Sequence, residues 1–402
     1  MHHQPHAAAG PYVKPDLLCL CHLSWDFVFQ RPHHLMSRFA RERRVFFWQA
    51  PVYDAAEAWL DVSTRDDGLV VAVPHLPWHG WDASDVMLRE LLDTFMAEQG
   101  IGEHVAWYYD PLAIGHTRHL QPLATVYDVM DELKSFKWAP DHLPDREREL
   151  LDRADLVFTG GRSIYEARVG LHPSVHLFPS SIDTAHFHRA RGGVADPADQ
   201  AGIPHPRIGY CGVLDERLDL ELVRGLAAAR PDWHLVFVGP AAKLDEDELP
   251  RAANIHYLAG KPYAELPDYL GGWDVAALFF ARNEHTRFIS PTKTPEYLAA
   301  GLPTVSSPIV DVVRAWGSTG LVHVAETVDG WVQAIESALA ETDRRGWLER
   351  VDEELAKTSW DRTWREMSEM MEEVLERPTF AAGDEWDALE NEVQGLMASA
   401  GD

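Results

Sequence analysis

The sequence predicts an α/β fold in which two Rossmann-like domains face a cleft. Short apolar runs alternate with amphipathic stretches, a pattern that is typical of βαβ units and a parallel sheet. The alternation stops at 189–206, a stretch rich in Gly, Ala, Pro and Asp, and then begins again. The chain of 402 residues therefore divides into two units of similar size. Parallel sheets bind ligands at the carboxyl ends of their strands, so two facing sheets make an interdomain cleft.

The N-terminal domain is expected to span 1–188. Its strand-like apolar runs are 16–21, 44–49, 69–73, 105–109, 124–129 and 156–159. Amphipathic stretches between these runs predict helices at 32–41, 85–99 and 144–153. We interpret 189–206 as a linker to the second domain, because it has no apolar periodicity.

The C-terminal domain is expected to span 207–358. Its predicted strands are 207–211, 234–238, 255–258, 275–280, 304–306 and 321–324. Its predicted helices are 218–229, 263–270, 296–300 and 330–340. The remaining residues, 359–402, predict two further helices at 361–376 and 385–397. Trp and Met residues recur at helical spacing in the first of these, which predicts a packing face.

The charge balance excludes one class of partner. The chain has 36 Lys and Arg against 64 Asp and Glu, a formal net charge of −28. A surface this acidic repels phosphates, so we expect no nucleic-acid partner. One basic cluster contains Arg38, Arg41, Arg43 and Arg44. It is either a solvated helix face or a patch that faces a phosphate or makes a peripheral contact with the inner face of a membrane.

Cysteines and apolar runs bear on redox chemistry and location. Three Cys residues without paired spacing argue against a disulfide framework and against a metal site. The N-terminus has no apolar core of signal length, and no run of about 18 apolar residues appears. We therefore expect a cytoplasmic protein. No cluster of carboxylates requires a metal ion, so we expect neither a metal nor a cofactor.

The segment 288–305 carries the most specific signals for a site. It follows an apolar strand and contains two Ser/Thr-Pro pairs, at 290–291 and 294–295, as at a helix start. Gly301 followed by Pro303 marks the end of the helix. The segment therefore predicts a short helix whose N-terminus lies just past the carboxyl end of a strand.

This helix start has the composition of an anion site. A helix N-terminus offers unpaired N–H groups and a partial positive charge. Lys293 and the hydroxyls of Ser290, Thr292 and Thr294 add donors that suit a phosphate or a diphosphate. Glu296 has a different use, because a carboxylate accepts two hydroxyl hydrogen bonds, as from a ribose diol. The alternative is that Glu296 only favours the helix dipole and that Lys293 is solvated.

The letters S-P-T-K-x-x-E-Y-L-A-A-G, which start at Ser290, resemble the donor-binding element of one family. The family is the group 1, glycogen-synthase-like glycosyltransferases with the GT-B fold, and the resemblance is to a divergent branch. It implies that Glu296 binds the nucleotide ribose and that the residues just before it hold the diphosphate. Many members carry a second glutamate, for which this sequence has Phe288. Residues 282–285 are then the local candidates to face the sugar.

Two further stretches resemble the same family. Residues 208–217 are similar to the loop that opens its second domain, which implies that Gly212 and Arg217 lie at the donor. Ser359-Trp360 looks like the start of the C-terminal helix that crosses back to the N-terminal domain.

The N-terminal domain supplies three catalytic candidates. The family often has a Gly-rich loop after its first strand, where this sequence has Arg31 and His33, whose side chains offer positive charge instead. For Arg31 the alternative is a helix cap or an ion pair. Asp131 follows the strand at 124–129, where a carboxylate binds acceptor hydroxyls or holds the catalytic geometry. The alternative for Asp131 is a turn residue that caps the next helix.

The resemblance implies a hexosyltransferase type of enzyme. It would move a sugar from a nucleotide-diphosphate sugar to a saccharide or lipid-linked acceptor, with retention, in cell-surface or exopolysaccharide synthesis. One alternative is a non-catalytic GT-B scaffold subunit that binds a nucleotide or a glycan. Another is a nucleotide-sugar epimerase, which needs a general acid–base pair at the sugar.

Overall fold

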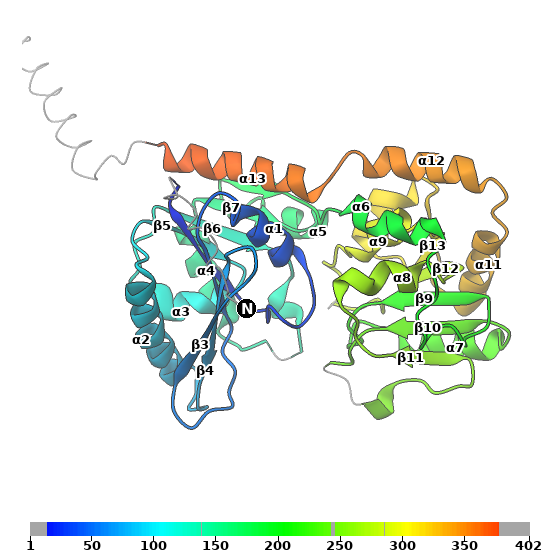
Figure 1. Ribbon diagram of the computed structural model, residues 1–402, viewed down its shortest axis with the longest axis horizontal. Helices are drawn as coiled ribbons and strands as arrows, with labels where there is room; N and C mark the ends of the chain where they lie inside the picture. Colours follow the sequence, from blue (N-terminus) through cyan, green and yellow to red (C-terminus); the bar gives the residue numbers. More distant parts are fainter. Residues whose placement is uncertain (1–13, 138, 243–245, 285, 378–402) are drawn as a thin grey trace, which may run out of the picture.

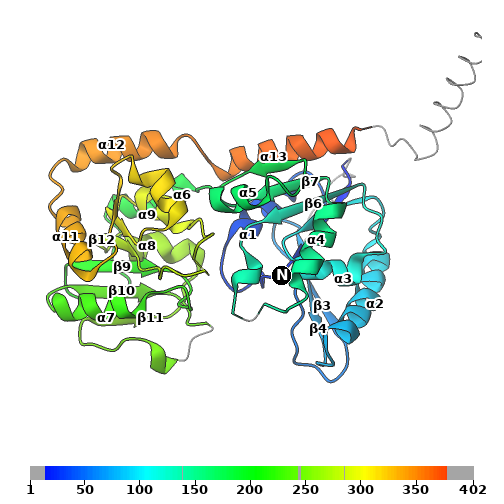
Figure 2. The same cartoon turned by 180° about the vertical axis from the view of Figure 1, so that it is seen from behind.

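A computed structural model describes residues 14–137, 139–242, 246–284 and 286–377. Two lobes lie side by side, each built on one sheet with helices against it (Figures 1 and 2). The predicted α/β fold with two Rossmann-like domains is confirmed. The helix expected at 385–397 lies outside the described residues. Within the described ranges, none of the helices is both long enough and apolar enough to cross a membrane.

The N-terminal sheet has eight strands in the order β3-β4-β2-β1-β5-β6-β7-β8. The strands are β1 (Asp16–Cys21), β2 (Val45–Gln49), β3 (Trp59–Thr64), β4 (Val70–His75), β5 (His104–Tyr108), β6 (Ala124–Val129), β7 (Leu156–Thr159) and β8 (Val175–Leu177). Neighbouring strands are parallel, except that β3 runs antiparallel to β4 at the edge. The strand order reverses between β1 and β5, so a crevice is expected at the carboxyl ends of these two strands.

Helices cover both faces of this sheet. They are α1 (Arg31–Phe39), α2 (Trp81–Gln99), α3 (Ile114–Thr117), α4 (Leu143–Arg153) and α5 (Arg162–Arg168). In β1, Leu17 and Cys19 pack into the core that contains α1 residues. Leu18 and Leu20 alternate with them and pack into the core that contains α2 residues. Burial on both faces explains why β1 reads as an uninterrupted apolar run.

The C-terminal sheet has six parallel strands in the order β11-β10-β9-β12-β13-β14. The strands are β9 (Arg207–Cys211), β10 (His234–Val238), β11 (Ile255–Leu258), β12 (Val275–Leu278), β13 (Thr304–Ser306) and β14 (Val322–Val324). Its helices are α7 (Leu220–Ala229), α8 (Leu266–Leu270), α9 (Lys293–Ala299), α10 (Val310–Val312), α11 (Val328–Leu339) and α12 (Arg344–Leu355). Here the order reverses between β9 and β12, which places a second crevice beside the end of β9.

The segment 189–206 packs against the C-terminal lobe, although its composition is that of a linker. It follows α6 (Thr184–His188) and begins with a short 3-10 helix. Ala190 and Ile203 are buried in the core of the C-terminal sheet. The side-chain oxygen of Gln200 accepts a hydrogen bond of 2.9 Å from the indole N–H of Trp273. Side-chain contacts thus fix a stretch that has no apolar period.

Helix α13 (Trp360–Leu375) lies along the N-terminal lobe, whereas α12 lies along the C-terminal lobe (Figure 1). The hydroxyl of Ser359 caps α13 by accepting a hydrogen bond from the backbone N–H of Arg362. Trp360, Met367 and Met371 are buried in the core shared with β1 and α1. The chain therefore passes from the C-terminal lobe back to the N-terminal lobe at α13, and its apolar stripe packs inward.

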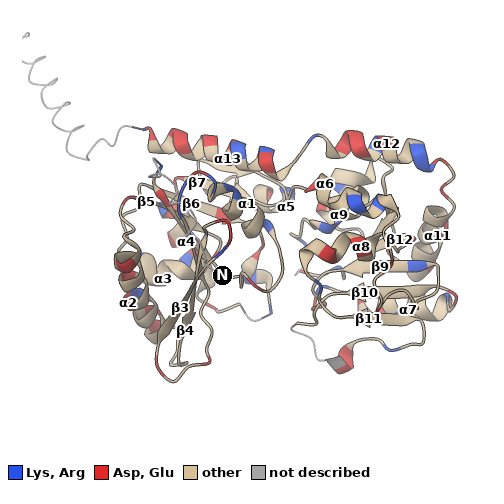
Figure 3. Ribbon diagram, in the orientation of Figure 1, with Lys and Arg blue, Asp and Glu red and all other residues tan. Residues whose placement is uncertain are grey.

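The four arginines of the basic cluster have acidic partners. The ion pairs are Arg38 and Arg41 with Asp361, Arg43 with Glu372, and Arg44 with Asp16. Two of these three acids belong to α13, along which acidic residues outnumber basic ones (Figure 3). Arg43 is buried, whereas the side chains of Arg41 and Arg44 remain partly exposed, so the cluster is a network of ion pairs at the surface. A peripheral membrane contact stays a prediction.

Replacement of Met371 by Ala should destabilise the N-terminal lobe. Met371 is fully buried, and truncation of a buried Met to Ala removes about 2–5 kcal/mol of stability. Urea unfolding of Met371→Ala should show this loss. The matched control is Glu369→Ala, which lies two residues away on the exposed side of α13. Equal stability of the two variants would contradict the packing of α13 described above.

Candidate active site

Helix α9 is fixed to the end of β9 by one buried tyrosine. Tyr297 is fully buried, and its hydroxyl accepts a hydrogen bond of 2.8 Å from the backbone N–H of Cys211. The same hydroxyl lies 3.3 Å from the Cys211 carbonyl oxygen, to which it donates. Cys211 is the last residue of β9. This contact fixes the position of the first turn of α9 relative to the carboxyl end of β9.

Two glycines allow the first turn of α9 to approach the strand ends. Gly212 follows β9 with φ of +151°, and a Cβ at this position would lie 2.1 Å from Cε of Lys293. Gly239 follows β10 with φ of +155°, and a Cβ there would lie 1.9 Å from the carbonyl oxygen of Gly212. Any larger residue would push these groups apart. The Lys293 side chain therefore lies directly over the backbone at the end of β9.

A cavity of about 650 Å³ opens between the lobes at this point. From the C-terminal lobe it is lined by residues predicted to bind a donor, namely Gly212, Arg217, Ser290, Thr292, Lys293 and Glu296. From the N-terminal lobe, Arg31, Asp131 and Ser180 contribute to its wall. The volume lies in the range typical of small-molecule sites, about 300–1,000 Å³. The structure thus brings most of the predicted donor residues together at one cavity.

On α9 the cavity presents a cation and a carboxylate that are free of salt bridges. Among the described residues, neither Lys293 nor Glu296 forms a salt bridge. Burial raises the pKa of the Glu296 carboxyl, while Lys293 and a hydrogen bond from Thr292 act in the opposite direction. Lys293 is therefore available to bind an anionic ligand, and Glu296 is available to accept hydrogen bonds from hydroxyl groups.

Arg217 also lines the cavity. Its guanidinium donates to both carboxylate oxygens of Asp215, at 2.9 Å for Nε to Oδ1 and 2.6 Å for Nη2 to Oδ2. Burial lowers the pKa of Arg217, but Asp215 and then Asp131 outweigh this, so the pKa lies above its ordinary value. Asp131 belongs to the opposite lobe. Charges from both lobes therefore meet at Arg217.

Thr294 does not reach the cavity, contrary to its predicted role. Its side chain is fully buried, and its hydroxyl oxygen has no hydrogen-bond partner among the described residues. Helix α9 begins at Lys293, one residue before Thr294. The second Ser/Thr-Pro pair therefore lies inside the first turn rather than at the cap, which turns Thr294 toward the core.

His33 and Arg31 are held by contacts inside the N-terminal lobe. His33 Nδ1 accepts a hydrogen bond of 3.0 Å from the Gln30 backbone, and Nε2 donates to the Trp25 carbonyl at 2.7 Å. Burial lowers the pKa of His33. Its ring caps α1 and does not line the cavity, so the structure does not support it as a catalytic residue.

Arg31 forms an ion pair, which was the alternative to a catalytic role for this residue. Its Nε donates to Asp128 Oδ2 at 2.9 Å, and its Nη1 donates to the Phe178 carbonyl at 2.7 Å. The Arg31 side chain is 2% exposed and that of Asp128 is 0% exposed. Its positive charge is directed into the sheet, although part of its side chain contributes to the cavity wall. Of the three catalytic candidates, Asp131 remains free to face a ligand.

The two lobes are joined beside the cavity by a contact that the sequence did not reveal. The Ser163 hydroxyl donates to Asp311 Oδ1 at 2.5 Å, and the Ser163 backbone N–H donates to the same atom at 3.1 Å. A Cβ on Gly161 would lie 2.6 Å from Asp311 Oδ2 and 2.7 Å from the Cβ of Ser290. Asp311 is a single acid in an apolar stretch, which is the only sequence signal for this role. The start of α5 thus binds a carboxylate of the other lobe.

Residues 282–284 do not line the cavity, although they were candidates to face the sugar. Arg282 pairs with Glu326, and the backbone N–H of Asn283 bonds to the hydroxyl of Thr286. His285 lies outside the described residues. Tyr263 was not predicted but does line the cavity, and its ring stacks on Phe29 of the other lobe at 4.5 Å.

Residues 205–341, which contain the C-terminal wall of the cavity, match the family model described as glycosyl transferases group 1. The C-terminal lobe is therefore similar to glycosyltransferases of group 1. The chain is also 28% identical over 103 residues to TuaH of Bacillus subtilis, whose name assigns it to teichuronic acid biosynthesis as a glycosyltransferase. This match spans 25% of the chain and 26% of the length of TuaH.

Solved structures show that the two lobes together have the GT-B fold. A sucrose-phosphate synthase from Thermosynechococcus elongatus superposes with a TM-score of 0.67 at 13% identity, covering 90% of this chain and 99% of that one. Anabaena HepE in complex with UDP and glucose superposes with a TM-score of 0.64 at 12% identity, covering 89% and 99%. At such low identity these likenesses concern the fold.

Replacement of Gly212 by Ala should damage the cavity between the lobes without unfolding the protein. The added Cβ would displace Lys293, so UDP or GDP, whichever the wild type binds, should bind at least about tenfold more weakly by calorimetry, a change of about 1.4 kcal/mol. Gly102→Ala is the control, because a Cβ there meets nothing within 4 Å. Unchanged affinity in Gly212→Ala would show that Lys293 does not hold the nucleotide.

Proposed function

We propose that this protein transfers a sugar from a nucleotide-diphosphate sugar to a hydroxyl group of a saccharide or lipid-linked acceptor. The observation that carries the proposal is the interlobe cavity with Lys293 and Glu296 side by side on α9, in a domain that matches group 1 glycosyltransferases. HepE, which has a similar fold, is described in complex with UDP and glucose. The name of TuaH supports a role in the synthesis of a surface polysaccharide.

Lys293 and Glu296 would bind different parts of the donor. Lys293 meets the diphosphate, and Glu296 accepts hydrogen bonds from the ribose diol. Negative charge develops on the diphosphate as the bond to the anomeric carbon breaks. Lys293 and Arg217 would stabilise that charge. Because Arg217 is already held by Asp215, its guanidinium is positioned before the donor arrives.

The opposite lobe supplies Asp131 on the acceptor side of the cavity. Its carboxylate would bind the acceptor hydroxyl or orient it toward the anomeric carbon. The Ser163–Asp311 contact holds the lobes together beside the site, which favours exclusion of water and so transfer over hydrolysis. The chemistry proposed is retaining, and it uses neither a metal ion nor a cofactor. Addition of EDTA should therefore leave the transfer rate unchanged.

One observation favours a second candidate, a GT-B subunit that binds a donor without transferring its sugar. Arg31 and His33 are both engaged in structural contacts, which leaves Asp131 as the candidate from the N-terminal lobe. The two functions differ in turnover. Release of free nucleotide in the presence of an acceptor supports the transferase, and donor binding without release supports the scaffold.

A donor should stabilise the protein, and Glu296 should be needed for that effect. A thermal-shift screen of UDP-, GDP-, ADP- and dTDP-sugars should identify one nucleotide that raises the melting temperature by mass action. Glu296→Ala should lose most of this increase. Glu284→Ala is the matched control, because Glu284 is exposed and does not line the cavity. The proposal fails if no nucleotide sugar shifts the wild type, or if both variants respond like the wild type.

Glu296 should reduce the stability of the ligand-free protein at neutral pH. Because its pKa is raised in the folded state, folding favours the protonated carboxyl, and this advantage is lost as pH rises through the folded pKa. Glu296→Gln should therefore melt at a higher temperature than the wild type at pH 7. The difference should shrink as pH falls toward about 4.3, the ordinary glutamate value. A variant that is less stable than the wild type at pH 7 would show that Glu296 is a structural residue.

A further inference from the structure

A second cavity, of about 480 Å³, lies in the N-terminal lobe next to the first. It occupies the crevice where the strand order reverses, because residues just after β1 and β5, such as His22 and Asp110, line it. Asp131 and Arg217 line both cavities. A molecule in the second cavity would therefore meet a donor at Asp131 and Arg217.

Most of the wall of this second cavity is apolar. The side chains that form it include Leu23, Trp48, Leu88, Leu112, Phe136 and Leu143. They come from strand β2, from helices α2 and α4 and from loops of the N-terminal lobe. An apolar cavity with a few polar groups is the usual form of a site for a compact organic ligand.

Two buried polar groups in this cavity have no partner. The indole nitrogen of Trp48 and both ring nitrogens of His116 lack hydrogen bonds among the described residues. Trp48 is 2% exposed and His116 is 5% exposed, and their ring centroids are 6.3 Å apart. Buried polar groups are nearly always hydrogen-bonded, so these two require a ligand or water.

The chemistry of the pair fits a hydroxyl group. Burial, and then the charge of Arg146, lower the pKa of His116 to about 3, so its ring is neutral and offers one donor and one acceptor. The indole of Trp48 is a donor only. A hydroxyl group of the ligand can accept a hydrogen bond from the indole N–H of Trp48. It can also donate a hydrogen bond to the unprotonated ring nitrogen of His116.

The charges around the cavity disfavour an anion. Arg146 is paired with Asp85 and also donates to the Leu112 carbonyl at 2.7 Å. Arg217 is paired with Asp215, as described above. The remaining acids in the wall, Asp110 and Asp131, have no salt bridge among the described residues. A phosphate group would meet carboxylates here and no free cation.

We propose that this cavity binds the acceptor, and that the acceptor is a neutral compound with an apolar or aromatic body and a hydroxyl group. Sugar phosphates and diphosphate-linked lipids are then poor acceptors. The inference rests on the proposed function, because it assigns the acceptor side of the same reaction. His116 and Trp48 recognise the ligand, and Asp131 lies where its reacting hydroxyl would meet the donor.

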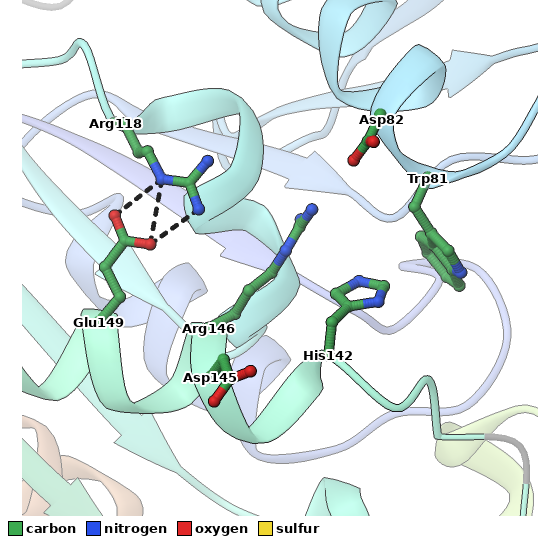
Figure 4. Close-up of a pocket in the computed structure, with 7 residues that line it drawn as sticks. All are labelled: Trp81, Asp82, Arg118, His142, Asp145, Arg146 and Glu149. Atoms are coloured by element: carbon green, nitrogen blue, oxygen red, sulfur yellow. Dashed lines mark hydrogen bonds and ion pairs between the residues drawn. The ribbon is translucent and has the colours of Figure 1, made fainter.

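An outer pocket on the same lobe differs from the second cavity in its lining. Trp81 and Arg146 line both pockets and so form part of the wall between them. The outer pocket also contains Asp145 and the Arg118–Glu149 ion pair, with 2.8 Å between Nε and Oε1 (Figure 4). Its charged, open surface lacks the apolar lining of the inner cavity.

The test is calorimetric titration without a donor. The probes are octyl β-D-glucopyranoside and 4-nitrophenyl β-D-glucopyranoside, compared with glucose and glucose 6-phosphate. Both neutral glycosides should bind at least about tenfold more tightly than glucose, because their apolar bodies are buried. Glucose 6-phosphate should show no binding. Binding of glucose 6-phosphate that equals or exceeds that of the glycosides, or no binding of either glycoside, would overturn the proposal.

Variants separate the cavity from non-specific binding of an amphiphile. His116→Phe keeps the ring but removes both nitrogens, and should weaken glycoside binding by about fivefold or more. Asp145→Asn changes the outer pocket only and should have no effect. Equal binding by wild type and His116→Phe would overturn the proposal.

The nucleotide-sugar thermal shift distinguishes this inference from the proposed function. If a nucleotide sugar stabilises the protein and the glycosides do not bind, the assignment of this cavity fails and the proposed function stands. If the glycosides bind and no nucleotide sugar does, the acceptor role is overturned together with the proposed function. If both bind, transfer of sugar to the 4-nitrophenyl glycoside should follow, and mass spectrometry would detect the product.

Discussion

The close approach of α9 to the end of β9 is the constraint on which the candidate site depends. Tyr297 sets this approach through its bonds to Cys211, and Gly212 and Gly239 allow it because neither has a Cβ. The same geometry places Lys293 over the strand end and Glu296 one turn further along α9. A change at the glycines would therefore act on ligand binding through position, with no loss of a charged group.

The cavity exists because the two lobes are held against each other at several points. Asp311 binds the start of α5 on one side, and Tyr263 stacks on Phe29 on another. On the outside, α13 returns to the N-terminal lobe, where Trp360 stacks on His34 at 4.5 Å. These contacts combine polar and aromatic groups, and they would have to break for a GT-B cleft to open. Asp131 and Arg217 then belong to one site only when the lobes are together.

Local signals predicted the fold well where burial is strong. The strands at 124–129, 156–159 and 207–211 were predicted at their observed bounds, because both faces are buried and the runs are apolar. β3 was missed because it is a largely exposed edge strand, and α12 because its residues are mostly charged. At the site, Lys293 and Glu296 were found from one contiguous segment. Asp311 was not predicted, because its partner Ser163 lies far away in the sequence. His116 was not predicted, because the other residues that line its cavity come from distant segments.

The most direct test of the central claim is a crystal structure of the protein with a nucleotide-diphosphate sugar. The account predicts a diphosphate within hydrogen-bond distance of Lys293 Nζ, a ribose on the Glu296 carboxylate, and the sugar directed toward Asp131. A nucleotide bound away from the space between β9, α9 and the N-terminal lobe would contradict it.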